Sequence, residues 1–408
     1  MLPTAAMPVD VKLINRVSIL EVFRSNGTLS VHEVSQKTGI SRLTIKKFIS
    51  VLLNNGLIRS AGKGPPDEMG GPRPELFEFS CDLRNFCLII EGDYLAAAVC
   101  DQQNHILAKK RIEFGAASMR DFLAMIWECW ESLSKECGLS KEQLYGVILA
   151  SDGVVDDESK ILIHRAKSPH WGTNIPLGDY LQEMFKGARI LIESAIKIAG
   201  ASEILWGQEA VKGKWLIVIY TNNGISSCRI NNSGTDFSKN IEIGRLGHVM
   251  VAPDDEEECG CGSHGCLDIM IGEGRIRRII KEKAPGSGKS VLTENSKIED
   301  VFTAAGGGDA LGRELVDYIA RMFFYALRNY LTLVSADILI FQGTYARAGD
   351  YFFCKLREYF TGRPYLLPQA VPGIICDKRS LVEIHLAGVS SAVSNYYFNN
   401  DCISGLKE

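Results

Sequence analysis

Residues 30–53 read SVHEVSQKTGISRLTIKKFISVLL, and this stretch holds two helix starts separated by one glycine turn. Ser30 and Glu33 have the S-x-x-E spacing of a capping box, so we expect a short helix that ends at Thr38-Gly39. Ser41 stands where the N-cap of a second helix is expected. A short helix, a turn containing glycine and a helix with a basic first turn are typical of a helix-turn-helix.

The second helix of this pair has a predicted buried face and a predicted open face. The apolar residues recur at helical spacing and are assigned to the buried face. They are Leu43, Ile45, Phe48, Ile49, Leu52 and Leu53. The open face carries Arg42, Thr44, Lys46 and Lys47.

The segments on either side complete a winged unit. Upstream, an apolar stripe predicts a helix over residues 12–24, which Asn26-Gly27 ends. Downstream, residues 57–59 (LIR) are typical of a strand, Gly62-Lys63-Gly64 of a tight turn, and residues 75–79 (ELFEF) of the returning strand.

The charge of this unit favours nucleic acid as its partner. Residues 1–64 contain nine Lys or Arg and three Asp or Glu, a net charge of +6, whereas the whole chain carries −4 and the remainder therefore −10. We assign base-edge contacts to Arg42, Thr44 and Lys46, and phosphate contacts to Lys47, Arg59 and Lys63. The alternative is a three-helix protein-interaction module with a solvated basic face.

Composition sets the wider class of the protein. The 408 residues are 46% apolar and 23% charged, which is typical of a globular protein with two or three domains. No run of 18 uncharged apolar residues predicts a membrane span, and the N-terminus lacks the order of a secretory signal. We therefore expect a cytoplasmic protein with no membrane partner, whose 12 cysteines are mostly reduced thiols.

The pattern changes after a Pro/Gly-rich linker at residues 64–74, and it then predicts an α/β body of two lobes. Strands are expected at residues 87–90, 95–99, 144–149, 188–192, 215–220 and 337–341. Helices are expected at residues 121–137, 177–185, 195–207 and 315–333.

A cluster of cysteines in this body has the spacing of a metal site. Three thiols lie within eight residues, and a histidine stands eleven residues upstream of the first; the set is His248, Cys259, Cys261 and Cys266. Four N/S ligands suit tetrahedral Zn(II) and leave no open position, which favours a structural role. His264 is a rival ligand, Asp254 and Asp255 are weaker ones, and reduced loop cysteines without metal are the alternative.

Four stretches resemble the ROK family of repressors, uncharacterised frames and sugar kinases. They are residues 71–76 (GPRPEL), 153–156 (GVVD), 244–248 (GRLGH, against G-E-x-G-H) and 259–268 (CGCGSHGCLD, against C-x-C-G-x-x-G-C-x-E). The resemblance covers nearly the whole chain and is to the repressor branch, which regulates xylose, glucose and N-acetylglucosamine genes. It implies an actin-like (ribonuclease H-like) two-lobed body that closes around a sugar. It also implies structural zinc on His248, Cys259, Cys261 and Cys266.

The phosphate-binding turns of the kinases in this family are degraded here. Where the kinases have D-x-G-G-T, residues 90–95 read IEGDYL, and where they have G-T-G-x-G, residues 221–225 read TNNGI. The late G-G turn is Gln342-Gly343-Thr344. Turns with fewer glycines offer fewer approachable backbone amides to an anion, so we expect no nucleotide binding.

The catalytic and sugar-binding positions implied by the resemblance are altered as well. The family's E-N-D-x-N, which supplies the base that deprotonates the sugar hydroxyl, is here residues 193–197 (ESAIK), with Ala195 in place of the Asp. We therefore expect no kinase activity. The remaining pocket is Ser194, Arg245, His248 and Asp268, in which only His248 is unchanged. Arg245 in place of an acid favours an anionic ligand such as a sugar phosphate, and the alternative is a pocket that binds nothing.

The sequence therefore predicts a ligand-responsive repressor, bound as a homodimer or tetramer to palindromic double-stranded operator DNA. We expect a winged helix-turn-helix at residues 1–64, a linker and wing return at 65–80, a first lobe at 81–200 with a C-terminal helix at 386–408, and a second lobe at 201–385 with a zinc loop at 244–268. The alternatives are an active ATP-dependent sugar kinase with a DNA-binding head, and a DNA-binding regulator with no small-molecule effector.

Overall fold

A computed structural model describes residues 8–65, 73–206, 214–222, 224–231, 241–284, 290–362 and 371–380. These residues form two compact units, one that ends at Ser194 and one that begins at Ala195, and each is described by itself. The predicted C-terminal helix at 386–408 lies outside the described residues, as do residues 66–72 of the predicted linker. Within the described ranges, no helix combines the length and the apolar character needed to cross a bilayer.

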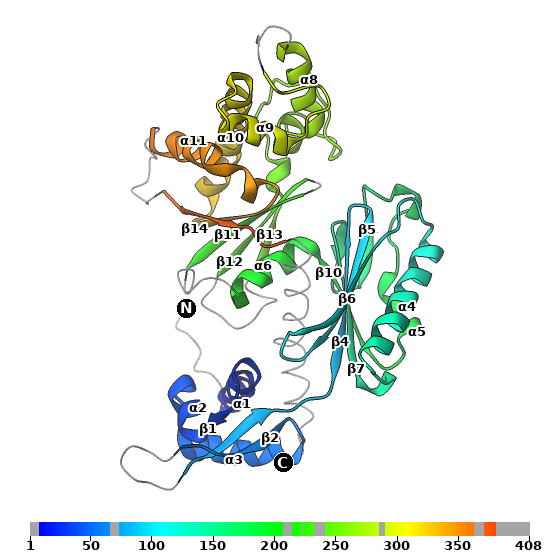
Figure 1. The fold of residues 1–408 in the computed structure, drawn as a ribbon, viewed down its shortest axis with the longest axis vertical. Helices are drawn as coiled ribbons and strands as arrows, with labels where there is room; N and C mark the ends of the chain where they lie inside the picture. The colour runs from blue at the N-terminus through cyan, green and yellow to red at the C-terminus, as the bar shows by residue number, and fades with distance from the viewer. Residues whose placement is uncertain are drawn as a thin grey trace. The chain divides into compact units, whose positions relative to one another are not determined.

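The first unit begins with a small three-helix head that carries a three-stranded sheet (Figure 1). Its helices are α1 Pro8–Ser25, α2 Val31–Thr38 and α3 Arg42–Asn54, and its strands are β1 Leu29–Ser30, β2 Ile58–Lys63 and β3 Glu75–Phe79. The strands pair antiparallel in the order β1-β3-β2. The predicted winged helix-turn-helix fold is therefore present.

Local signals in the sequence set the helix ends of the head. The Glu33 amide donates to the Ser30 hydroxyl at 3.3 Å, and the Glu33 carboxylate accepts from the Ser30 amide at 2.7 Å, so the capping box forms. Gly39 ends α2 with a φ of 70°. The Ser41 hydroxyl accepts from the Thr44 amide and caps α3.

Two predictions about the head are wrong in detail. Leu43 and Leu53 are 67% and 37% exposed, because the core is formed on the side of α3 that carries Ile45, Phe48, Ile49 and Leu52. The tight turn expected at residues 62–64 is also absent. Gly62 instead has a φ of 92° and forms a bulge, so β2 continues to Lys63 before the hairpin closes.

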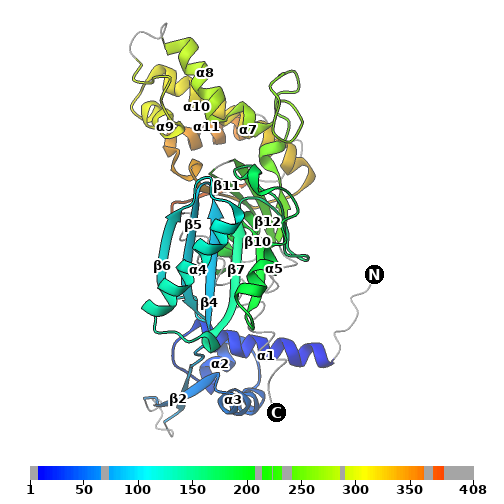
Figure 2. The ribbon, with the colours of Figure 1, turned by 90° about the vertical axis from the view of Figure 1, so that its right-hand side faces the viewer.

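The rest of the first unit is a five-stranded sheet in the order β10-β7-β4-β5-β6. The strands are β4 Arg84–Glu91, β5 Tyr94–Asp101, β6 Ile106–Glu113, β7 Leu144–Ser151 and β10 Arg189–Ser194. The β4, β5 and β6 strands are antiparallel, whereas β7 and β10 join the sheet in parallel. The helices α4 Met119–Glu136 and α5 Leu177–Met184 share one apolar core with the sheet and lie on the same side of it (Figures 1 and 2). A small hairpin of β8 Val154–Asp156 and β9 Ile161–His164 follows β7.

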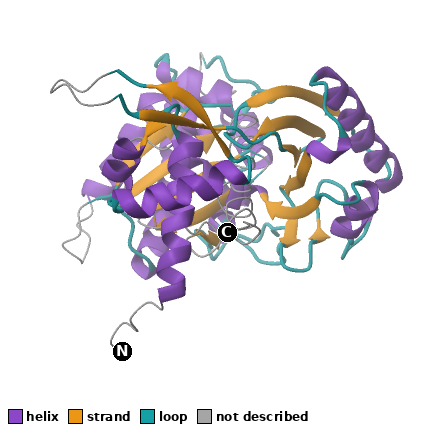
Figure 3. Cartoon of the chain, turned by 90° about the horizontal axis from the view of Figure 1, so that it is seen from below, coloured by secondary structure: helices purple, strands orange, loops and turns teal. Residues whose placement is uncertain are grey.

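The second unit contains another five-stranded sheet, in the order β13-β12-β11-β14-β15. Its strands are β11 Trp215–Thr221, β12 Ile225–Asn231, β13 Ile241–Gly244, β14 Ile338–Gly343 and β15 Gly373–Asp377. Its helices are α6 Ala195–Trp206, α7 Leu267–Met270, α8 Glu273–Lys283, α9 Ile298–Gly306, α10 Ala310–Leu333 and α11 Gly349–Gly362. Figure 3 distinguishes the helices and the strands of the described residues by colour.

The two faces of the second sheet are covered differently. Ile217, Ile219 and Phe341 pack into a large apolar core with α9, α10 and α11. On the other face, α6 approaches so closely that a Cβ on Gly200 would lie 2.5 Å from the Cys228 sulfur. The predicted helix at 195–207 is therefore confirmed through Trp206, and Gly207 lies outside the described residues.

Candidate functional site

The first candidate surface is the exposed side of α3. Arg42, Thr44, Lys46 and Lys47 are all exposed, and the first turn of the helix contains no acid. Two of these side chains already have partners, because Arg42 lies 2.6 Å from the His32 ring and the Thr44 hydroxyl lies 2.9 Å from that of Ser41. The arrangement presents cations at the N-terminal end of an exposed helix, where recognition helices contact base edges.

The wing adds two more exposed cations. Arg59 on β2 is 71% exposed and forms an ion pair with Glu78 on β3 at 2.7 Å, while Lys63 is exposed at the end of the same strand. An exposed pair of this kind contributes little to stability, so it leaves Arg59 able to exchange its partner for a phosphate. The six residues predicted to contact DNA therefore all lie on the surface of the head.

The head is attached to the sheet of the first unit through a buried arginine that the sequence did not single out. Arg24, at the end of α1, is only 2% exposed, and its guanidinium donates to the Gln102 carbonyl at 2.8 Å and to the Glu21 carboxylate. The Gln103 side chain donates back to the Arg24 carbonyl at 3.1 Å. These bonds hold the turn after β5 against α1.

The second candidate site is the cysteine loop of the second unit. His248, Cys259, Cys261 and Cys266 bring one ligand atom each to within 4.8 Å of one another. The Cys259 sulfur lies 3.6 Å from His248 Nδ1, and the Cys261 and Cys266 sulfurs are 3.7 Å apart. Tetrahedral zinc with Zn–S near 2.3 Å places its ligand atoms about 3.6–3.8 Å apart, so the cluster fits this ion.

The chemistry of the donors agrees with this fit. Burial and the two neighbouring thiols raise the pKa of Cys266 to about 12, whereas a hydrogen bond from the Ser263 backbone lowers the pKa of the exposed Cys261 thiol. A bound cation would favour the thiolate form of the buried Cys266. Among the described residues the rival ligands do not join the group. Asp255 instead pairs with Arg275 at 2.5 Å, and His264 and Asp254 are exposed.

The predicted sugar-pocket residues are divided between the two units. Ser194 ends β10 of the first unit, whereas Arg245, His248 and Asp268 belong to the second. Asp268 accepts the Ile225 amide at 2.8 Å, and burial raises the pKa of this carboxyl. It packs against Gly247 so tightly that a Cβ there would lie 2.5 Å from the carboxylate, which explains the glycine before His248. Arg245 is exposed beside this segment.

The first degraded phosphate turn is filled by a side chain of the protein itself. The Gly92 amide donates to Asp152 at 2.9 Å, and the Gly92 carbonyl accepts from Arg165. Arg165 is 1% exposed and also donates to Asp152 at 2.7 Å and to the Ser168 hydroxyl at 2.6 Å. The Asp152 carboxylate thus takes the turn amide that an external anion would need.

The later turns in the second unit are also closed by internal bonds. The Thr344 amide donates to the Thr221 carbonyl at 2.9 Å, and the Tyr345 amide donates to the Thr221 hydroxyl at 3.0 Å. Ala195, at the position of the family's base, is the first residue of α6 and is 2% exposed. Asn223 of the predicted second turn lies outside the described residues.

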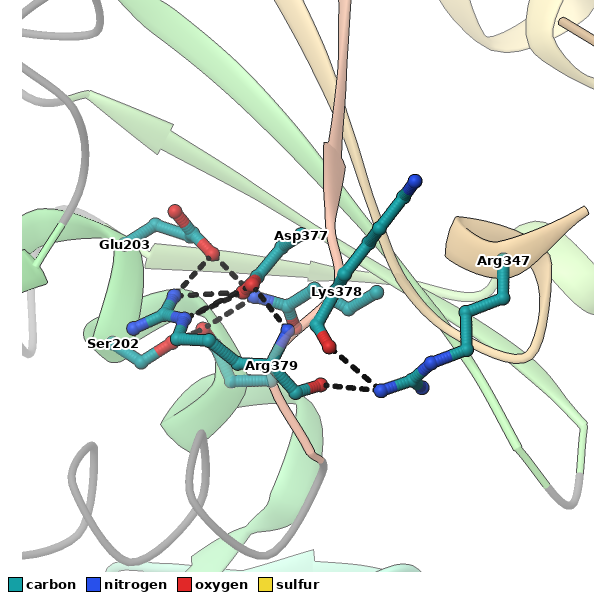
Figure 4. Close-up of polar contacts among 8 residues, drawn as sticks. Ser202, Glu203, Arg347, Asp377, Lys378 and Arg379 are labelled. Carbon is teal, nitrogen blue, oxygen red and sulfur yellow. Dashed lines mark hydrogen bonds and ion pairs between the residues drawn. The ribbon is translucent and has the colours of Figure 1, made fainter. Parts of the chain in front are cut away.

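A buried polar network at the ends of β14 and β15 was not expected from the sequence (Figure 4). Glu203 on α6 accepts from Gln342 at 2.6 Å and from Arg379 at 2.9 Å, and Arg379 also pairs with Asp377 at 2.7 Å. Burial and the adjacent Asp377 carboxyl raise the pKa of Glu203 to about 7. One arginine faces two acids, so the network retains a proton near neutral pH. No local pattern marks the network, because Glu203 on α6 meets Gln342 and Arg379 only through the packing of the helix against the strand ends.

Comparison with known proteins agrees with this architecture. A model of the ROK family matches residues 86–370, and a model of winged helix-turn-helix DNA-binding domains matches residues 13–59. The chain is 20% identical to a xylose repressor of Caldicellulosiruptor bescii over 87% of this chain and 89% of that protein. It is 26% identical to a glucokinase of Halalkalibacterium halodurans, over 57% of this chain and 71% of that one.

A solved structure extends the likeness to the whole fold. The crystal structure of a ROK family transcriptional regulator, a homologue of the E. coli MLC protein, has a TM-score of 0.77 and 18% identity, and the match covers 94% of this chain and 97% of that chain. The match therefore spans head and body together. The winged helix-turn-helix followed by an α/β two-lobed body, predicted from the sequence, is confirmed.

Proposed function

Because the chain belongs to the ROK family and carries a winged helix-turn-helix DNA-binding domain, we propose that it is a transcriptional repressor whose body is a sensor and not a kinase. The observation that carries the proposal is α3, which presents exposed cations and no acid in its first turn. Relatives that match along both head and body include a xylose repressor, whereas the glucokinase matches over a shorter part of the chain. DNA binding by the head is thus the activity that the body would regulate.

The DNA complex follows from the geometry of such heads. A homodimer places two copies of α3 about one helical turn apart in successive major grooves of a palindromic operator. Arg42, Thr44 and Lys46 contact base edges, and Lys47, Arg59 and Lys63 contact phosphates.

Operator binding can be tested with a duplex selected from a random library. We expect Arg42→Ala combined with Lys46→Ala to lower the affinity at least 100-fold without unfolding the body. Lys109→Ala with Lys110→Ala, two exposed cations on β6, is the matched control and should leave the affinity unchanged. Equal affinity of the head variant and the wild type, measured by fluorescence anisotropy at physiological salt, contradicts the assignment.

The body is proposed to be an inactive kinase that holds structural zinc. Ala195 has no group that accepts a proton, Asp152 fills the first phosphate turn, and the four N/S ligands leave zinc no open position. When bound, zinc supplies a cross-link that fixes the loop bearing His248. An ATP-dependent phosphorylation assay over a panel of sugars should show no turnover, and turnover abolished by a substitution in the body overturns this part of the proposal.

The effector is proposed to be an anionic sugar. Arg245 is exposed next to the His248 loop and offers a cationic fork to a phosphate or carboxylate. A thermal-shift screen of neutral and phosphorylated sugars tests this, with Arg245→Gln as the variant that should lose the response. If no anionic sugar raises the melting temperature or changes the affinity for the operator, the chain is a regulator without such an effector.

A further inference from the structure

The side of α3 that points directly away from the core has an apolar side chain in its first turn. The helix turns about 100° per residue, so residues at i, i+4, i+7 and i+11 lie along one stripe. On the side opposite the core this stripe consists of Leu43, Lys47, Ser50 and Asn54, all exposed. Leu43 is 67% exposed.

The neighbours of Leu43 define what can lie against it. Arg42 and Thr44 have bonding partners at His32 and Ser41, and the surrounding open face is cationic through Lys46 and Lys47. A protein partner with an apolar surface would have to desolvate these cations, which is costly. A polyanion that presents an isolated apolar group satisfies both the cations and the leucine.

The DNA major groove is such a partner. Its base edges carry hydrogen-bonding groups and one apolar group, the C5 methyl of thymine. Residues in the first turn of a recognition helix contact these edges. A single exposed leucine is ordinary on a protein surface, but this one occupies the first turn of the helix, opposite the core and among the cations.

We infer that Leu43 is a specificity-determining residue that packs on the C5 methyl of one thymine in each half of the operator. The inference rests on the proposed DNA-binding function and adds to it an apolar contact with one base.

The test removes the methyl group and nothing else. Each thymine of the selected operator is replaced in turn, in both halves, by deoxyuridine, and the affinity is measured for the full-length wild type and for Leu43→Ala. For one position we expect deoxyuridine to weaken wild-type binding about fourfold per half-site, the effect of one buried methyl group. The same replacement should leave the affinity of Leu43→Ala unchanged.

Controls separate this inference from the function on which it rests. Leu53→Ala, at the other exposed end of α3, should respond to deoxyuridine as the wild type does. Equal responses of the wild type and Leu43→Ala at every thymine overturn the role of Leu43 while leaving DNA binding intact. Failure of the wild type to select any duplex overturns the proposed function itself.

Discussion

Two loops of the body differ in how far they keep the patterns that they resemble. Residues 244–268 bring four ligand atoms to the spacing of a tetrahedral ion, with His248 Nδ1 3.6 Å from the Cys259 sulfur. Residues 90–95 instead form a turn whose Gly92 amide is bonded to Asp152 of the same protein. The first loop has a geometry that a metal ion can occupy, whereas the Gly92 amide of the second loop already has a hydrogen-bond partner.

Under the proposed function, this difference separates the parts of a kinase-like body that a sensor keeps from those that it loses. A closed metal site stabilises a loop whether or not chemistry follows, because its ligands bind the ion and nothing else. A phosphate turn is useful only if its amides remain free, and a buried free amide costs free energy. In this chain the bond from the Gly92 amide to Asp152, which is itself paired with Arg165, removes that cost.

The largest expected effect comes from breaking the metal site. Cys261→Ser removes one thiolate ligand, so we expect bound zinc to fall from about one ion per chain to near zero. The free energy of unfolding of the second unit should fall by at least about 4 kcal/mol, because metal binding is coupled to folding. Atomic absorption and urea unfolding measure the two effects.

The control for this variant is Cys354→Ser, an exposed cysteine on α11. It should retain both zinc and stability. Full zinc content in Cys261→Ser would show that the ligand set is wrong.

The next effect comes from opening the filled turn. Asp152→Ala leaves Arg165 charged, buried and without its carboxylate, which should destabilise the first unit by about 3–5 kcal/mol. The melting temperature of the variant should also rise in sulfate by more than that of the wild type, because sulfate can occupy the position beside Gly92 that the carboxylate has left.

Asp93→Ala, an exposed acid in the same turn, is the matched control for Asp152→Ala and should change stability little. Wild-type stability in Asp152→Ala would contradict the explanation of the turn as internally satisfied.

The smallest effect concerns the proton held by the network of Figure 4. Because the pKa of Glu203 is raised from 4.5 to about 7, the folded protein holds a proton that the unfolded chain releases, so this contribution to stability is lost as the pH rises from about 4.5 through 7. The pKa of Asp377 is lowered by its bonds to Arg379 and Glu203, despite its burial. The stability that the ionised Asp377 carboxylate contributes is therefore lost only below about pH 4.

Glu203→Gln keeps an acceptor for Gln342 and Arg379 without ionising. We expect this variant to reduce the change in the free energy of unfolding between pH 5.5 and 8 by on the order of 2 kcal/mol, as measured by urea unfolding. Glu282→Gln, an exposed position on α8, is the control. An unchanged pH dependence in Glu203→Gln would place the retained proton elsewhere.

Much of the head and of the metal loop was predictable because their determinants are local. Ser30 and Glu33 cap one helix from within four residues, and three of the four candidate zinc ligands stand within eight residues. The side of α3 on which Leu43 lies was mispredicted, because the apolar character of a residue in a short helix does not show whether the residue faces the core or the solvent. Only the packing of Ile45, Phe48 and Leu52 against α1 and β3 fixes which side is buried.

The sequence by itself determined the order of elements, the caps, the basic charge of the head, the donor atoms of the metal loop and the absence of an acid at Ala195. These depend on residue type and short spacing. Only the tertiary structure decided that Asp152 and Arg165 close on Gly92 across 60 and 73 residues, that Asp255 pairs with Arg275 and not with the cysteines, and that Glu203 meets Asp377. Such contacts depend on how strands, helices and loops distant in the chain pack together, which brings side chains together that no local pattern connects.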